Sequence, residues 1–230
     1  MTKQDYTIIE NYMLTHITDS AHDKHHIYRV LNAAVDIASH EQGIDMGVLV
    51  AACLLHDIGR SVQMANPAVC HAKAGGQMAF DFFTSHNLLS QKWHPRQARH
   101  VQDCISTHRY RGDSPPQTIE AKILFDADKL EAAGVIGIAR TLIFSGHIDG
   151  PLYTLNEGGR IITGTADVDT GTFFQHYNHK LKNVYDSFYT ARAKEIAQKR
   201  KNAAENFYNA LYAEVTDNIK SGTQLTEVIK

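Results

Sequence analysis

An adjacent histidine and aspartate, His56 and Asp57, follow directly after a run of apolar residues, LVAACLL. A carboxylate at the end of such a run is costly to bury unless a partner compensates its charge. A metal ion, an arginine or a set of backbone donors would each compensate it, and a capped or salt-bridged pair is the structural alternative. The doublet alone therefore leaves both a metal site and a purely structural role open.

Two other segments contain residues that would complete a set of metal ligands. His26 lies beside His25 in the stretch HDKHHIYRV, and Asp128 lies near Asp126 in the stretch FDADKL. Two imidazoles and two carboxylates form a mixed nitrogen and oxygen set, which suits Mn, Fe, Co, Ni or Mg. Four protein ligands leave two positions of an octahedral ion for water and a substrate oxygen, as metal-assisted hydrolysis requires.

Each of these two segments offers two candidates for one position. A helix turns by about 100° per residue, so only one of His25 and His26 can face the ion well. Asp126 and Asp128 are about 200° apart on a helix, so we do not expect them to share one ion. Helical geometry alone does not choose between the members of either pair.

The sequence resembles the HD-domain metal-dependent phosphohydrolase superfamily, with its H…HD…D pattern, and more narrowly its bacterial YedJ/YpgQ-like branch. The resemblance covers most of the chain and is strongest in the stretches HDKHHIYRV, LLHDIGR, HAKAGG, EAKILFDADKLEAAGVIGIAR and HYNHKL. The family spacings H-x-x-R-V and A-D-x-L select His26 and Asp128. The resemblance thus implies a single divalent ion held by His26, His56, Asp57 and Asp128, with the identity of the metal open.

Several cations near these motifs are candidates for catalysis or substrate binding. Asp57 can orient a water as well as bind the ion, and Arg29 and Arg60 are candidates to act on a phosphate group. Lys180, in the stretch HYNHKL, is a candidate to bind substrate. A surface or salt-bridging role is the alternative for each of the three cations.

Further histidines lie between the doublet and Asp128. His71 and His108 are candidates to bind substrate, and a lone helical histidine with a structural role is the alternative for each. Some HD relatives bind a second ion through such histidines, and His94 and His100 also lie in this part of the chain. No two of them are adjacent, and the branch resemblance implies one ion, so we expect a mononuclear site.

The elements that must position these residues are helical, because apolar residues recur at helical spacing along most of the chain. We expect an all-α fold, an HD-domain helical bundle, in a single domain spanning 1–230 with its core at about 20–145. Residues 145–172 contain six glycines and predict an irregular loop with room for a small hairpin. Two helices over 173–216, divided near residue 190, are expected to close the chain.

The composition limits the classes of protein to consider. Apolar residues make up 43% of the chain, which argues against disorder, and the formal net charge of -2 gives no sign of a nucleic-acid or membrane-surface protein. No stretch approaches the roughly 20 apolar residues of a membrane span. The three cysteines lack C-x-x-C spacing, which predicts reduced thiols and a cytoplasmic protein.

These observations together predict a metal-dependent phosphohydrolase. It would act on a nucleotide or another small phosphate or pyrophosphate ester through a metal-activated water. The expected partner is a small phosphorylated substrate, foremost a nucleotide, with no nucleic acid or membrane partner and with a homodimer left open. The alternatives are a metal-containing ligand-binding or regulatory module without turnover, and a dinuclear HD oxygenase.

Overall fold

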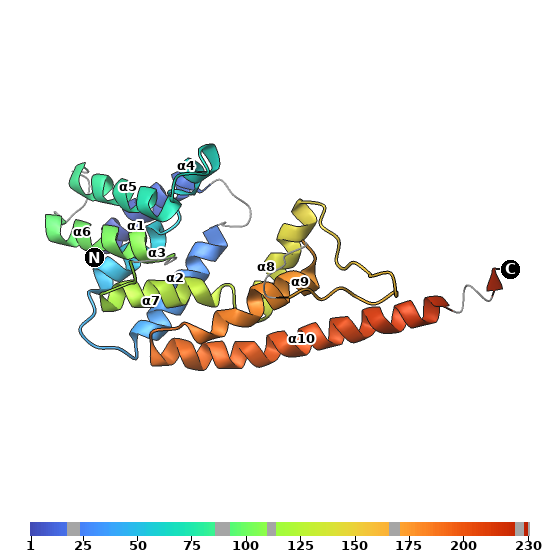
Figure 1. Cartoon of the computed structure of the whole chain (residues 1–230). Coiled ribbons are helices and arrows are strands. Elements are labelled where there is room, and N and C mark those ends of the chain that lie inside the picture. The colour runs from blue at the N-terminus through green and yellow to red at the C-terminus, as the bar shows by residue number, and fades with distance from the viewer. Residues whose placement is uncertain (18–23, 86–92, 110–113, 166–170, 224–227, 230) are drawn as a thin grey trace. The chain divides into compact units, whose positions relative to one another are not determined.

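The described part of the chain is helical throughout its regular elements. The computed structural model describes residues 1–17, 24–85, 93–109, 114–165, 171–223 and 228–229 (Figure 1). Within these ranges no β-strand is present, and Leu155 and Ile161 form an isolated antiparallel bridge. The expected all-α class is therefore confirmed.

The chain divides into two compact units. The first consists of Met1–Glu131 and Phe188–Ala193, and the second of Ala132–Ser187 and Lys194–Lys230. The division at residue 131 falls inside the segment that we expected to form one core. A single domain over the whole chain stays a prediction.

The first unit contains α3 (Met46–Leu55) and further helices. They are α1 (Lys3–His16), α2 (Lys24–Ala38), α4 (Arg60–Ala65), α5 (His71–Ser85), α6 (Pro95–Thr107) and α7 (Ile119–Leu130). Helix α3 contacts α1, α2, α5, α6 and α7, and it is apolar on every side, which suits a central position. Its N-terminus is capped by Asp45, whose carboxylate accepts from the backbone N–H groups of Gly47 and Val48 at 3.0 and 3.1 Å.

The turn after α3, residues 56–59, lies directly against α5. A Cβ atom at Gly59 would overlap the carbonyl oxygen of His71 and would lie 2.6 Å from the backbone nitrogen of Gly75. Only glycine permits such an approach of two backbones. The turn that contains the His56-Asp57 doublet is thereby held beside the first turn of α5.

The segment Met46–Ala65 has the length and apolar composition of a membrane-spanning helix. However, 61% of this window is buried inside the protein. The segment is also interrupted by the turn between α3 and α4. Burial of this extent is typical of a core segment that packs against other helices.

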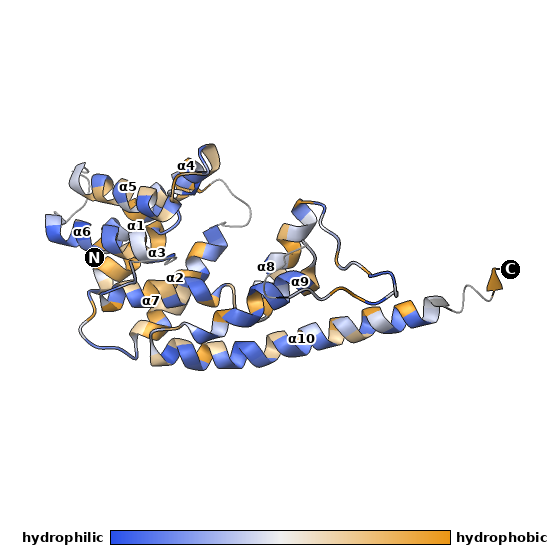
Figure 2. Cartoon of the chain, in the orientation of Figure 1, coloured by the Kyte–Doolittle hydropathy of each residue, from blue (hydrophilic) through white to orange (hydrophobic). Residues whose placement is uncertain are grey.

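The second unit contains α8 (Gly134–His147), α9 (Phe173–His179), the 3-10 helix η1 (Leu181–Asp186) and most of α10 (Ala191–Thr223). Figure 2 shows hydrophilic residues along much of α10, interrupted at intervals by apolar ones. The apolar residues of α10 that belong to the same cluster as Phe173 and Phe174, or pack against it, recur at helical spacing and include Ala204, Tyr208, Leu211 and Val215. One face of this helix thus closes the core of the second unit.

The C-terminal half differs in detail from the sequence expectation. The first C-terminal helix ends at His179 and continues as the 3-10 helix, because Leu181 and Val184 bury their side chains at the spacing of three that this helix presents on one face. The loop after α8 contains the antiparallel Leu155–Ile161 bridge, and beside it the backbone N–H of Ile162 donates to the carbonyl oxygen of Thr154 at 2.8 Å. Residues 166–170 of this loop lie outside the described residues.

Candidate metal centre

The four residues predicted to bind the ion lie together in the first unit. Helix α2 provides His26, the turn after α3 provides His56 and Asp57, and α7 provides Asp128. The Nε2 atoms of His26 and His56 lie 3.3 Å apart. From Asp57 Oδ2, both of these nitrogens lie at 3.6 Å. Oδ1 of Asp128 lies 3.5 Å from Nε2 of His26 and 3.9 Å from Nε2 of His56.

These separations match a set of atoms around a common ion. Adjacent ligands with bonds of about 2.0–2.3 Å lie about 3 Å from one another around an octahedral ion. Oδ2 of Asp57 is buried and has no hydrogen-bond partner among the described residues. A buried oxygen left in this way is expected where an ion or ligand binds. The residues therefore fit a divalent metal ion.

The protonation states in this cluster are those that metal binding needs. His56 Nδ1 lies 2.8 Å from the carbonyl oxygen of Cys53, which can only accept, so the lone pair of Nε2 faces the cluster. Burial lowers the pKa of His56 to about 4, against the opposing effect of Asp57 and Asp128. Burial alone would raise the pKa of Asp57, but His56, His26 and Arg60 hold it well below its usual value. At neutral pH the imidazole of His56 is neutral and the Asp57 carboxylate is ionised.

The structure also separates the members of the two competing pairs. His26 is 1% exposed within the cluster, whereas His25 is exposed. Asp126 is fully buried, and its carboxylate accepts from the backbone N–H groups of Tyr189 and Thr190, away from the cluster. His26 and Asp128 are therefore the members that lie with the doublet, in agreement with the family spacings.

The second oxygen of Asp57 faces a different set of side chains. Oδ1 lies 2.9 Å from Nε of Arg60, 3.4 Å from Nε2 of His71 and 3.7 Å from Nε2 of His108. His71 begins α5 and His108 follows α6, and both are buried. Each of Asp57, His71 and His108 has one potential ligand atom, and these three atoms lie within 4.8 Å of one another. We call these three residues the second group.

The imidazoles of the second group have well-defined partners on their other ring nitrogens. Nδ1 of His108 lies 2.6 Å from the carbonyl oxygen of Ile105, so its Nε2 carries a lone pair toward Asp57. Nδ1 of His71 lies 2.7 Å from Oε1 of Gln63 and 3.2 Å from Nη1 of Arg109. Nε2 of His71 is buried without a hydrogen-bond partner among the described residues.

The buried histidines are expected to make the metal-free protein sensitive to acid. Burial lowers the pKa of His56 to about 4 and that of His71 to about 3. The unfolded chain, with histidine pKa values near 6.5, takes up these protons first. The free energy of unfolding should therefore fall as the pH drops from about 6.5 toward 4, by about 1.4 kcal/mol per pH unit for each histidine.

Urea denaturation of the metal-free protein between pH 7 and pH 4.5 measures this slope. In His71→Gln the slope should become shallower, because one buried titrating group is removed. His40→Gln is the matched control, since His40 is exposed, and it should keep the wild-type slope. Equal slopes in the two variants would contradict the assignment.

One buried glutamate beside the cluster was not singled out by the sequence. Arg29 donates to Oε2 of Glu131 from Nε at 2.9 Å and from Nη2 at 2.8 Å. The same oxygen lies 3.2 Å from Nδ1 of His26. Glu131 lies one helical turn after Asp128, and this spacing was the signal available in the sequence. Arg29, a candidate for catalysis, is thus engaged with Glu131 at the edge of the cluster.

The remaining candidates lie elsewhere. His94 caps the N-terminus of α6, and His100 lies 3.2 Å from Oε2 of Glu120, so neither belongs to the two groups around Asp57. Lys180 follows α9 in the second unit. Its role in substrate binding stays a prediction.

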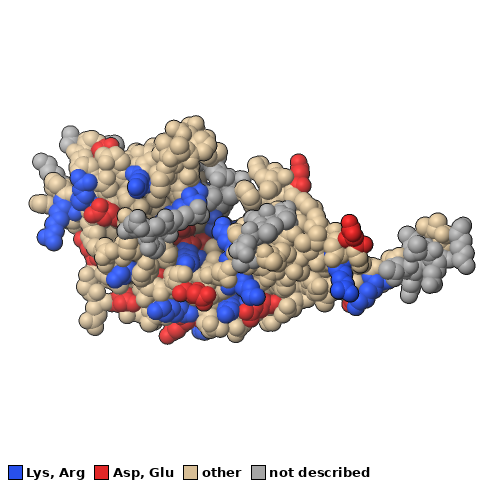
Figure 3. Space-filling model, in the orientation of Figure 1, with Lys and Arg blue, Asp and Glu red and all other residues tan. Residues whose placement is uncertain are grey.

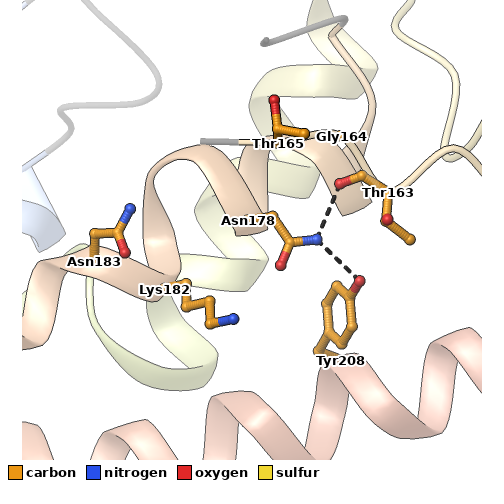
Figure 4. Close-up of a pocket in the computed structure, with 7 residues that line it drawn as sticks. All are labelled: Thr163, Gly164, Thr165, Asn178, Lys182, Asn183 and Tyr208. Atoms are coloured by element: carbon orange, nitrogen blue, oxygen red, sulfur yellow. Dashed lines mark hydrogen bonds between the residues drawn. The ribbon is translucent and has the colours of Figure 1, made fainter. Parts of the chain in front are cut away.

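The second unit contains a pocket whose polar lining differs in residue type from the metal centre (Figure 4). The amide nitrogen of Asn178 donates to the carbonyl oxygen of Thr163 at 2.9 Å and to the hydroxyl of Tyr208 at 3.1 Å. The residues that line the pocket are Thr163, Gly164, Thr165, Asn178, Lys182, Asn183 and Tyr208. None of these lining residues is a histidine or a carboxylate, so the pocket lacks the usual metal ligands.

The HD domain family model matches residues 24–133. This part of the chain is an HD domain. The match begins at α2 and ends just after α7, so it includes the four cluster residues as well as His71 and His108.

This chain is similar to known proteins over most of its length. It is 28% identical to the uncharacterised protein YpgQ of Bacillus subtilis over 196 residues, 84% of each chain. A crystal structure of YpgQ in complex with ADP matches with a TM-score of 0.68 at 24% identity, over 91% of this chain and 97% of that one. An HD-superfamily hydrolase from Bacillus thuringiensis matches with a TM-score of 0.67 at 25% identity, over 93% and 96%. The resemblance inferred from the motifs is confirmed.

Proposed function

We propose that this protein is a metal-dependent phosphohydrolase that acts on a nucleotide or another small phosphate or pyrophosphate ester. The observation that carries the proposal is the buried cluster of His26, His56, Asp57 and Asp128, with an oxygen of Asp57 left without a partner. A divalent ion bound there would supply Lewis-acid chemistry and an activated water. The mixed nitrogen and oxygen ligands suit Mn, Fe, Co, Ni or Mg.

The chain's own residues would bind and orient the phosphate. Arg60 donates to Asp57 at 2.9 Å, which fixes the carboxylate, and its charge lies beside the cluster. Guanidinium groups bind phosphate oxygens well and stabilise charge that develops on them. His71 and His108 lie on the same side of Asp57, and we propose that they contact the substrate.

A nucleotide is the substrate class that we favour. The structure of YpgQ with ADP supports this choice, because a relative with the same fold binds a nucleoside diphosphate. The test is the release of phosphate or pyrophosphate from nucleoside triphosphates and generic phosphoesters by protein reconstituted with Mn²⁺. Turnover of several of these compounds without any metal would contradict the proposal.

The second group gives a specific reason to consider a second ion. The lone pair on Nε2 of His108 faces a carboxylate oxygen of Asp57, and two acceptors that face each other call for a cation, a proton or a water between them. Against a second ion stand the guanidinium groups of Arg60 and Arg109, which place positive charge beside Asp57 and His71. We therefore propose one ion and keep a dinuclear centre as the second candidate.

The metal content distinguishes the two candidates. We expect one ion per chain after reconstitution with Mn²⁺ and dialysis, measured by inductively coupled plasma mass spectrometry. His108→Ala should keep this value, because His108 lies outside the four-residue cluster. Two ions in the wild type that fall to one in His108→Ala would establish a dinuclear centre, which an HD oxygenase also requires.

We also propose a cytoplasmic protein with a small-molecule partner. The three cysteines are unpaired thiols, as expected for a reducing compartment. Figure 3 shows Lys and Arg interspersed with Asp and Glu over the visible face, which agrees with the small net charge. Nucleic acid and membrane surfaces are therefore not among the proposed partners, and a homodimer stays open.

A further inference from the structure

We propose that Glu131 is a positioning residue, which fixes the tautomer and orientation of His26 so that Nε2 of this histidine is available to the metal. The inference rests on the metal site of the proposed function. It adds a residue that neither the sequence motifs nor the HD pattern assigns.

The contacts define a chain of three side chains. Oε2 of Glu131 lies 3.2 Å from Nδ1 of His26. Nε and Nη2 of Arg29 donate to the same oxygen at 2.9 and 2.8 Å. Glu131 is 3% exposed and His26 is 1% exposed, so water competes little for this hydrogen bond.

The chemistry of the pair decides the tautomer. An ionised carboxylate can only accept, so Nδ1 of His26 must carry the proton that lies toward Glu131. The two hydrogen bonds that the guanidinium group of Arg29 donates to Oε2 stabilise the ionised form of the Glu131 carboxylate. The other ring nitrogen, Nε2, then presents its lone pair to Asp57, Asp128 and the ion. A carboxylate on the outer nitrogen of a metal-binding histidine also raises its strength as a ligand.

The register of two packed helices produces this arrangement. His26 and Arg29 are one turn apart on α2, and Asp128 and Glu131 are one turn apart at the end of α7. Helices α2 and α7 are in contact. The backbone N–H of Glu131 donates to the carbonyl oxygen of Asp128 at 3.0 Å, which ties Glu131 to the last turn of α7. Each helix therefore provides one ligand and, one turn later, one supporting side chain.

The chain offers a closely matched control at the other end of α7. Glu120 is also buried, at 4% exposure, and its carboxylate also has a histidine partner, with Oε2 3.2 Å from Nε2 of His100. It accepts a further hydrogen bond from the backbone N–H of Asp45 at 2.8 Å. Glu120→Gln thus removes the charge of a buried, histidine-paired glutamate on the same helix but away from the cluster.

Titration of Mn²⁺ into the metal-free full-length variants tests the proposal. Glu131→Gln should weaken Mn²⁺ binding by about 10–100-fold, the usual effect of removing an outer partner of a metal ligand. Glu120→Gln should bind as the wild type does, even though both variants are expected to lose some stability. Wild-type affinity in Glu131→Gln would overturn the inference. A wild-type protein that binds no divalent metal would instead overturn the proposed metal site.

A second measurement reads the protonation of His26 in the wild-type protein itself. The ¹⁵N shifts of His26 in the metal-free wild-type protein report which ring nitrogen carries the proton, with His26→Gln used to assign the signals. We expect a proton on Nδ1 and a bare Nε2. A proton on Nε2 would overturn the inference, because Glu131 would then not set the tautomer.

Discussion

Asp57→Ala is expected to abolish hydrolysis and metal binding together. Asp57 is the residue shared by both groups, since Oδ2 lies 3.6 Å from Nε2 of His26 and His56 while Oδ1 faces His71 and Arg60. Its removal takes away a ligand and the anchor of Arg60 at once. We expect kcat/KM for phosphate or pyrophosphate release to fall by at least about 10³-fold.

The fold should survive this substitution. Asp57 lies in the turn between α3 and α4, so its replacement leaves the apolar contacts of α3 in place. Circular dichroism should therefore show a helical protein with a cooperative thermal transition. The loss of activity would then reflect the site and not the fold.

Asp103→Ala provides the control for Asp57→Ala. Asp103 is an exposed aspartate on α6 in the same unit. We expect it to keep wild-type turnover and wild-type Mn²⁺ binding. Activity in Asp57→Ala within about tenfold of this control would remove Asp57 from the proposed mechanism, since one preorganised group alone is usually worth more than that.

Asp126→Ala is expected to cause the largest loss of stability. The carboxylate is fully buried, and its Oδ2 accepts from the backbone N–H and the hydroxyl of Thr190, both at 2.7 Å. Oδ1 accepts from the backbone N–H of Tyr189 at 2.9 Å. Hydrogen bonds to a charged group contribute about 1.5–3 kcal/mol each, and the donors left behind would be buried without a partner. We expect the free energy of unfolding to fall by roughly 4 kcal/mol.

Urea denaturation measures this loss. Asp103→Ala again serves as the control and should change the free energy of unfolding by less than about 0.5 kcal/mol, as is usual at exposed positions. Thr190→Val removes one donor to Asp126 and the hydroxyl that accepts from the backbone N–H of Ala193 at 3.3 Å, so its effect should be intermediate. A loss below about 1 kcal/mol in Asp126→Ala would show that this carboxylate does not anchor the segment Phe188–Ala193.

The sequence by itself determined the class of the fold and the nature of the candidate site. Periodicity of apolar residues is a local property, and it indicated helices along most of the chain. The segment 46–58 is apolar almost all round, and this pattern alone indicates a central, buried helix. The types of His26, His56, Asp57 and Asp128 suggested a divalent metal, and the family spacings chose between adjacent candidates.

Only the tertiary structure decided which other side chains meet these four. His71 begins α5 and His108 follows α6, and both face one oxygen of Asp57, while His26 and His56 face the other. Glu131 reaches His26 across 105 residues of sequence. Periodicity tells which face of a helix is buried, but not which two faces come into contact or which oxygen of a carboxylate faces a given partner.

Asp126 and Asp128 illustrate the physical limit of the sequence. They lie two residues apart in α7, and this spacing shows only that their side chains point in different directions. The packing of the segment 188–193 against α7 gives Asp126 its backbone donors, whereas the packing of α2 and α3 against α7 brings Asp128 to the histidines. Such long-range contacts depend on how helices pack, and helix packing is fixed by the complete core and not by any local pattern.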